Sequence, residues 1–155
     1  SEQNIQRDQA EIAAAVQFLK QKEYQKANEA FLKFESERQT SPFWLSAQLG
    51  LADSFHQLGQ SDQAIQVLRR VRDTSLSRSP GIAAMASYQM SFVFEDLGQF
   101  ERTLAALSEA ENQGVHLKPQ ISKVEIPARK SIVFAKLGQT QDSQAAMARA
   151  LRGID

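Results

Sequence analysis

The fold is decided by a hexapeptide that recurs three times, as Phe55-His-Gln-Leu-Gly-Gln60, Phe94-Glu-Asp-Leu-Gly-Gln99 and Phe134-Ala-Lys-Leu-Gly-Gln139. The glycines of these three copies are 39 and 40 residues apart. A weaker copy, Phe18-Leu-Lys-Gln-Lys-Glu23, has Lys22 at the glycine position, 37 residues before Gly59. Such a period predicts tandem helix-turn-helix units, in which the glycine ends the first helix in a left-handed conformation. We expect Lys22 either to accept the strain of that conformation or to use a different turn.

The residues on both sides of the hexapeptide repeat as well. Small residues occupy the position seven places before the glycine: Ala15, Ala52, Ser91 and Ser131. Large apolar residues occupy the position nine places after it: Phe31, Leu68, Leu107 and Met147. Small residues let two helix backbones approach closely, and apolar residues three or four apart share one helix face. The pattern therefore predicts an all-α fold of paired, stacked helices.

The expected helix boundaries follow from the glycines and prolines. Pro42 and Pro80 follow serines, an order typical of a helix N-cap and its first residue. Pro127 falls within the seventh expected helix, so we expect it to kink that helix or to mark its true start. The expected helices cover residues 3–20, 24–38, 42–57, 61–74, 80–97, 100–113, 120–137 and 140–152.

Residues of the second and third repeats resemble the tetratricopeptide repeat (TPR) family, in which small, aromatic and glycine positions follow in this order. The positions that carry the resemblance include Ala52, Phe55, Gly59, Ala64 and Leu68. The resemblance implies a right-handed superhelical stack of about four TPR-like repeats. It implies one domain over residues 1–155, with units at about 3–38, 42–74, 80–113 and 119–152. The periods of 37–40 residues exceed the family's usual length of about 34, and the weak fourth unit is expected to pack as a cap.

A second resemblance concerns the location of the protein. The stretch from Tyr24 to Phe34, followed by Ser41-Pro-Phe-Trp44, is similar to repeats of periplasmic bacterial envelope proteins. This resemblance implies a periplasmic or envelope-associated location, and the cytoplasm is the alternative. The absence of cysteine is compatible with either compartment.

Composition narrows the possible functions. Lys+Arg and Asp+Glu are both 18, so the chain lacks the basic excess that is typical of nucleic-acid binders. The basic run Arg69, Arg70, Arg72 and Arg78 is better explained as a complement to a helix dipole than as an RNA or lipid site. No apolar run approaches the roughly 20 residues that a membrane helix needs.

No pattern of catalytic or metal-ligating residues appears in the sequence. The two histidines, His56 and His116, lie in different units and have no second ligand at helical spacing. Each loop glycine stands alone, so it cannot cradle a phosphate. We therefore expect no catalytic residue, no metal site and no cofactor, and we predict that the protein is not an enzyme.

The TPR resemblance implies a concave groove lined mainly by the first helix of each pair. The residues expected to contact a partner there are Leu49, Asp53, His56, Met85, Tyr88, Phe92 and Glu95. This lining is apolar with an acidic side, which suits an amphipathic helix or an extended apolar peptide. We thus predict a protein–protein interaction scaffold that binds a peptide or helix of a partner, and the second resemblance makes a bacterial envelope complex its expected setting. The alternative is a self-associating structural module, a homodimer without a peptide ligand.

Overall fold

The computed structural model describes residues 1–154, and within this range it contains helices and no β-strand. The prediction of an all-α fold is therefore confirmed. The helices are α1 (Glu2–Lys20), α2 (Tyr24–Glu37), α3 (Trp44–Gln57), α4 (Ser61–Ser75), α5 (Pro80–Asp96), α6 (Phe100–Asn112), α7 (Ile126–Lys136) and α8 (Thr140–Gly153). Over the same residues, every helix is too short or too polar to cross a lipid bilayer.

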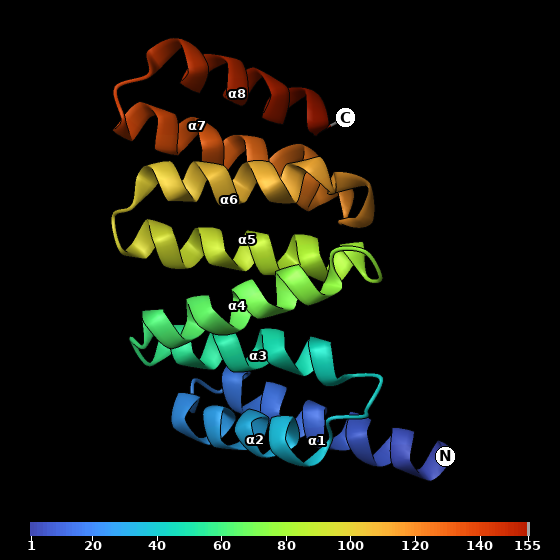
Figure 1. Ribbon diagram of the computed structural model, residues 1–155. Coiled ribbons are helices and arrows are strands. Elements are labelled where there is room, and N and C mark those ends of the chain that lie inside the picture. The colour runs from blue at the N-terminus through green and yellow to red at the C-terminus, as the bar shows by residue number, and fades with distance from the viewer. Residues whose placement is uncertain (155) are drawn as a thin grey trace. The chain divides into compact units, whose positions relative to one another are not determined.

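The chain divides into two compact units, Ser1–Asp73 and Thr74–Asp155. Successive helices run back and forth within each unit, so that neighbours along the chain are neighbours in space (Figure 1). The first unit holds α1 to α3 and nearly all of α4, and the second holds α5 to α8. Whether all 155 residues form a single repeat domain stays a prediction, and the units are described one at a time.

The recurring hexapeptide is a helix-ending motif with two backbone hydrogen bonds. Gln60 N–H donates to the Phe55 carbonyl at 2.8 Å, and Gly59 N–H donates to the His56 carbonyl at 3.0 Å. This pairing defines a Schellman turn, which requires a positive φ at the glycine. The φ angles are 76° at Gly59, 70° at Gly98 and 74° at Gly138. Lys22 has the same turn with a φ of 61°, so it accepts the strain.

Small residues bring helices close together in both units, and Ser131 is one of those predicted from the repeat. In the first unit, Gly50 of α3 lies against the Phe31 ring of α2, so closely that a Cβ on Gly50 would be 2.3 Å from Cζ of that ring. In the second unit, Ser131 and Ser143 each donate a hydroxyl hydrogen bond to the other's backbone carbonyl at 2.8 Å. Ser131 is 5% exposed, and the bonds join α7 to α8.

The segment before α7 differs from the expected continuous helix over residues 120–137. Residues Gln120–Glu125 form a π-helical turn, and the α-helix begins at Ile126, next to Pro127. Proline has no N–H, so it cannot give the Lys123 carbonyl its usual hydrogen bond. The backbone of Gly153 in α8 approaches that carbonyl instead: a Cβ on Gly153 would be 2.3 Å from the Lys123 oxygen. Pro127 therefore marks the true start of α7.

Candidate functional site

One face of α5 carries all the residues of the second unit that the sequence predicted as partner contacts. Met85, Tyr88, Phe92 and Glu95 follow at spacings of three and four residues, so their side chains share one side of the helix. Helix α7 reaches this face through Arg129. The structure thus brings these four predicted residues together, but it gives them different surroundings.

Tyr88 lies in the core, not on the exposed lining expected from the sequence. The residue is 6% exposed and clusters with Leu107, Leu117 and Ile126, while Met85 is half-buried against the same cluster. The Tyr88 hydroxyl donates to Oε2 of Glu125 at 3.0 Å. Burial, followed by this hydrogen bond and the negative charge of Glu125, raises the pKa of Tyr88. Tyr88 therefore belongs to the core of the second unit, and its ring is not accessible to a partner.

Phe92 is the exposed aromatic residue of this face, with 40% of its surface accessible. Its ring meets the Tyr88 ring edge to face, with the centroids 5.0 Å apart and the planes at 79°. The Arg129 guanidinium stacks on Phe92, with Cζ 3.7 Å from the ring centroid. These two contacts hold the Phe92 ring in one orientation.

Arg129 also pairs with Glu95, the acidic residue among the predicted partner contacts of α5. Its Nη2 atom lies 2.9 Å from Oε1 of Glu95, and its Nη1 atom donates to the Ser91 hydroxyl at 2.7 Å. The Arg129 side chain is 14% exposed and that of Glu95 is 32% exposed. Glu95 is therefore already paired within the unit.

Neither Arg129 nor Ile132 was among the partner contacts predicted from the sequence. Ile132 follows Arg129 by one helical turn on α7 and is 52% exposed. Phe92 and Ile132, together with the Glu95–Arg129 ion pair, are called the Phe92–Ile132 surface below. Arg129 stands nine residues before its turn glycine, at the position that Gly50 occupies in α3. A charged residue at this position was the signal available in the sequence, but only the fold showed that Arg129 faces Glu95.

The predicted contacts of the first unit, Leu49, Asp53 and His56, lie at spacings of four and three on one side of α3. All three are half-buried, and Oδ1 of Asp53 accepts a hydrogen bond from Nε2 of Gln57 at 3.3 Å. Among residues 1–154, no group of three or more His, Asp or Glu residues is placed to hold a metal ion. The role of the α3 residues stays a prediction.

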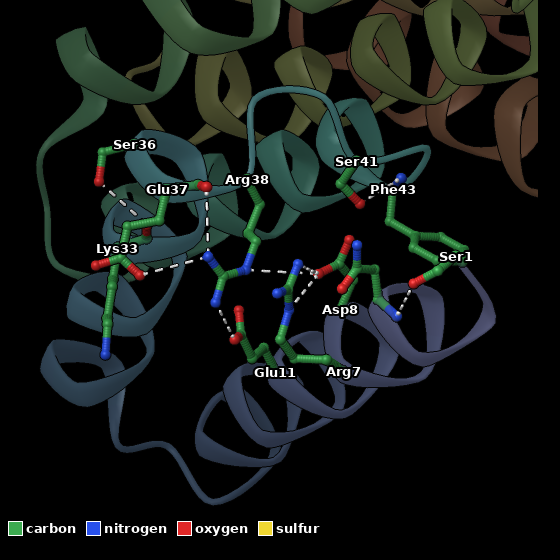
Figure 2. A network of polar contacts seen from close by, with 11 residues as sticks. Ser1, Arg7, Asp8, Glu11, Lys33, Ser36, Glu37, Arg38, Ser41 and Phe43 are labelled. Carbon is green, nitrogen blue, oxygen red and sulfur yellow. Dashed lines mark hydrogen bonds and ion pairs between the residues drawn. The ribbon is translucent and has the colours of Figure 1, made fainter.

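A polar network at the start of the first unit was not foreseen from the sequence (Figure 2). Asp8 of α1 is 3% exposed, and its Oδ1 atom lies 3.1 Å from Nη2 of Arg7 and 3.5 Å from Nε of Arg38. Arg38 also binds Oε1 of Glu11 at 2.8 Å. Burial favours the neutral acid, but hydrogen bonds from Ser41 and Arg7 and the charges of both arginines outweigh it, so the pKa of Asp8 is lowered.

This network fastens α1 to the segment between α2 and α3. A cavity of about 280 Å³ adjoins it and is lined in part by Asp8, Arg38 and Ser41. The charges in the network compensate one another at short range, as structural ion pairs do. Its evident role is to hold the first helix in place.

Comparisons with known proteins support the helical-repeat fold. Residues 46–74, which span most of α3 and nearly all of α4, match the family model described as tetratricopeptide repeat. No curated protein sequence matches the chain. The resemblance to TPR proteins, inferred from the repeated positions, is thereby confirmed for this segment.

Solved structures extend the likeness over nearly the whole chain. A Podosopora anserina protein described as a kinesin light chain with nearly identical TPR-like repeats has a TM-score of 0.79 at 15% identity, covering 96% of this chain and 74% of its own. BtubC (BKLC) from P. vanneervenii has a TM-score of 0.83 at 16% identity, covering 94% and 62%. MamA of MSR-1 has a TM-score of 0.68 at 12% identity, covering 94% and 76%. Together they establish a TPR-like repeat fold, which is consistent with a protein–protein interaction scaffold.

Proposed function

We propose that this protein is a non-enzymatic scaffold that binds an amphipathic helix or an extended apolar peptide of a partner protein on the Phe92–Ile132 surface. The observation that carries the proposal is the exposure of two large apolar side chains on neighbouring first helices of the second unit. Phe92 is 40% exposed and Ile132 is 52% exposed. Apolar side chains of the partner would remove these two residues from water, which favours binding.

The polar atoms around Phe92 support this role. Because Glu95 and Arg129 already neutralise each other, a partner can cover the surface without burying an unpaired charge. The Phe92 ring is held between Tyr88 and Arg129, so little rotamer freedom is lost on binding. A preorganised aromatic residue with a paired arginine beside it has the composition of an interface hot spot.

We propose a second, separate partner-binding surface on the first unit, formed by Leu49, Asp53 and His56 of α3. The three residues lie on one side of one helix and combine an apolar, an acidic and an imidazole side chain.

The test begins with affinity capture and mass spectrometry, followed by a titration with the isolated partner segment. The Phe92→Ala/Ile132→Ala double variant removes both exposed apolar side chains. We expect its affinity to fall by about tenfold or more, since truncating a hot-spot residue costs at least about 1–2 kcal/mol. Val115→Ala is the matched control, because Val115 is 91% exposed and lies outside this surface. Unchanged affinity of the double variant would place the binding site elsewhere.

Self-association and location complete the proposal. A homodimer without a peptide ligand is the alternative function, and the exposed apolar residues Met147 and Leu151 of α8 favour it. The periplasmic or envelope-associated location rests on the sequence resemblance alone, with the cytoplasm as its alternative. Fractionation of cells that express the full gene would distinguish these compartments.

A further inference from the structure

Helix α8 exposes an apolar face, and the position of Met147 on that face is buried in every other repeat. Met147 is 38% exposed, Leu151 is 60% exposed and Ile154 is 67% exposed, and the spacings of four and three put them on one side of the helix. Met147 stands nine residues after Gly138. The residues nine places after the other turns, Phe31, Leu68 and Leu107, are at most 1% exposed.

Within each unit, the first helix of the next pair covers that position. Phe31 of α2 lies under Gly50 of α3, in contact so close that it leaves no space for a Cβ. Leu107 of α6 belongs to one core cluster with Ile126, the first residue of α7. The occupant that fits the open face of α8 is therefore another helix of the same first type.

Helix α1 presents the matching open face. In α3 and α7, the residues 12, 8 and 5 places before the turn residue are buried: Ala47, Leu51 and Ser54, and Ile126, Lys130 and Val133. Two of these face the preceding helix, since Ser54 accepts a hydrogen bond from Asn28 and Lys130 pairs with Glu111. The corresponding residues of α1 are all exposed: Ala10, Ala14 and Gln17.

We propose that α8 of one copy of this chain packs on α1 of a second copy, so that the repeat–repeat interface continues from molecule to molecule. The equivalent positions are chemically matched. At the α6–α7 junction, Nζ of Lys130 meets Oε1 of Glu111 at 2.7 Å. The same two positions at the proposed junction are Leu151 and Ala14, so an ion pair is replaced by two apolar residues, one on each side.

The close contact between the helices is matched as well. Phe31 requires Gly50 opposite it, because its rigid ring fills the space of a Cβ. At the proposed junction the corresponding residues are Met147 and Ala13. A flexible methionine adapts to the extra methyl group of alanine, whereas a phenylalanine ring cannot.

This interface joins two different faces, so the contact is heterologous and differs from the self-complementary contact of a symmetric dimer. Each added copy leaves one α8 face and one α1 face free, and association is head-to-tail. The average size of the assembly therefore rises with protein concentration and does not stop at a dimer.

Sedimentation velocity over a wide range of protein concentrations tests this proposal on variants that introduce one charge, or an opposite pair of charges, into the proposed interface. Leu151→Glu and Ala14→Lys each place one charge in the apolar junction, and we expect each variant to remain monomeric. The double variant Leu151→Glu/Ala14→Lys recreates the pair found between Glu111 and Lys130, and we expect it to regain concentration-dependent growth. Leu151 and Ala14 are both exposed, so the folded units tolerate the changes, which far-UV circular dichroism verifies.

Val115→Glu is the matched control and should associate like the wild type, because Val115 lies outside both faces. The Phe92→Ala/Ile132→Ala variant should also associate normally, which separates this proposal from the peptide-binding one. A wild type that is monomeric at every concentration would overturn the proposal. So would growth by either single variant, a limit at symmetric dimers, or failure of the double variant to recover.

Discussion

Replacing Gly50 by alanine tests whether the repeat packs as the structure describes. A Cβ at this position would lie 2.3 Å from Cζ, 2.5 Å from Cε1 and 2.9 Å from Cε2 of the Phe31 ring. Carbon atoms in contact prefer separations of about 3.5–4.0 Å, so either the ring or helix α3 must move by roughly 1 Å. Phe31 is 1% exposed, and its ring therefore has no open side to move into.

The magnitude follows from two opposing effects. Alanine in place of a helical glycine stabilises the folded state by about 1 kcal/mol. Adding a methyl group to a well-packed core costs about 1–3 kcal/mol. Because the three ring contacts are all far below the preferred separation, we expect the upper part of that range and a net loss of about 1–2 kcal/mol. The melting temperature should fall by about 3–8 °C.

Thermal and urea denaturation, followed by far-UV circular dichroism, measure this loss. The matched control is Gly81→Ala on α5, where a Cβ would lie 3.3 Å from the nearest atom, the His116 carbonyl oxygen. A double-mutant cycle with Phe31→Leu identifies the cause, since a smaller side chain opposite residue 50 should relieve at least about 1 kcal/mol of the penalty. If Gly50→Ala raises stability, or if the two changes are additive, the proposed contact between α2 and α3 is refuted.

Two further predictions concern single residues of the first unit. Lys22→Gly should raise the free energy of unfolding by about 0.5–1 kcal/mol, because glycine adopts the φ of 61° without strain, and a lower urea midpoint would contradict this. The lowered pKa of Asp8 means that its ionised form stabilises the folded state above the unfolded pKa, and that this stability is lost as the pH falls through the folded pKa. Asp8→Asn should therefore flatten the decline in stability below about pH 4, as measured by urea midpoints across that range, and an equally steep decline in the variant would contradict the assignment.

Much of the predicted fold depended on interactions that are local in sequence. The turn at Gly59 is closed by hydrogen bonds to His56 and Phe55, all within one hexapeptide. The same six residues therefore predict the same helix end wherever they occur, and the start of α7 beside Pro127 has a similarly local cause. The small positions were predictable for a related reason, since helical periodicity alone places them on one face.

The tertiary structure decided which predicted contacts are available. Tyr88 and Phe92 are four residues apart on one side of α5, and nothing in that spacing distinguishes them. Tyr88 is buried because Leu117 and Ile126, which lie 29 and 38 residues later in the chain, pack against it, whereas Phe92 keeps 40% of its surface exposed. Arg129 likewise meets Glu95 across a separation of 34 residues.

The sequence by itself thus determined that the chain folds into paired helices and where the glycine turns end the first helix of a pair, because backbone hydrogen bonds and helical periodicity act over a few residues. Only the tertiary structure decided that Glu95 is already paired and that Tyr88 lies in the core. The partners of a side chain come from distant segments, and their positions depend on how whole helices pack. In this protein the open faces on α1 and α8 became visible in the same way, by comparing the burial of equivalent positions.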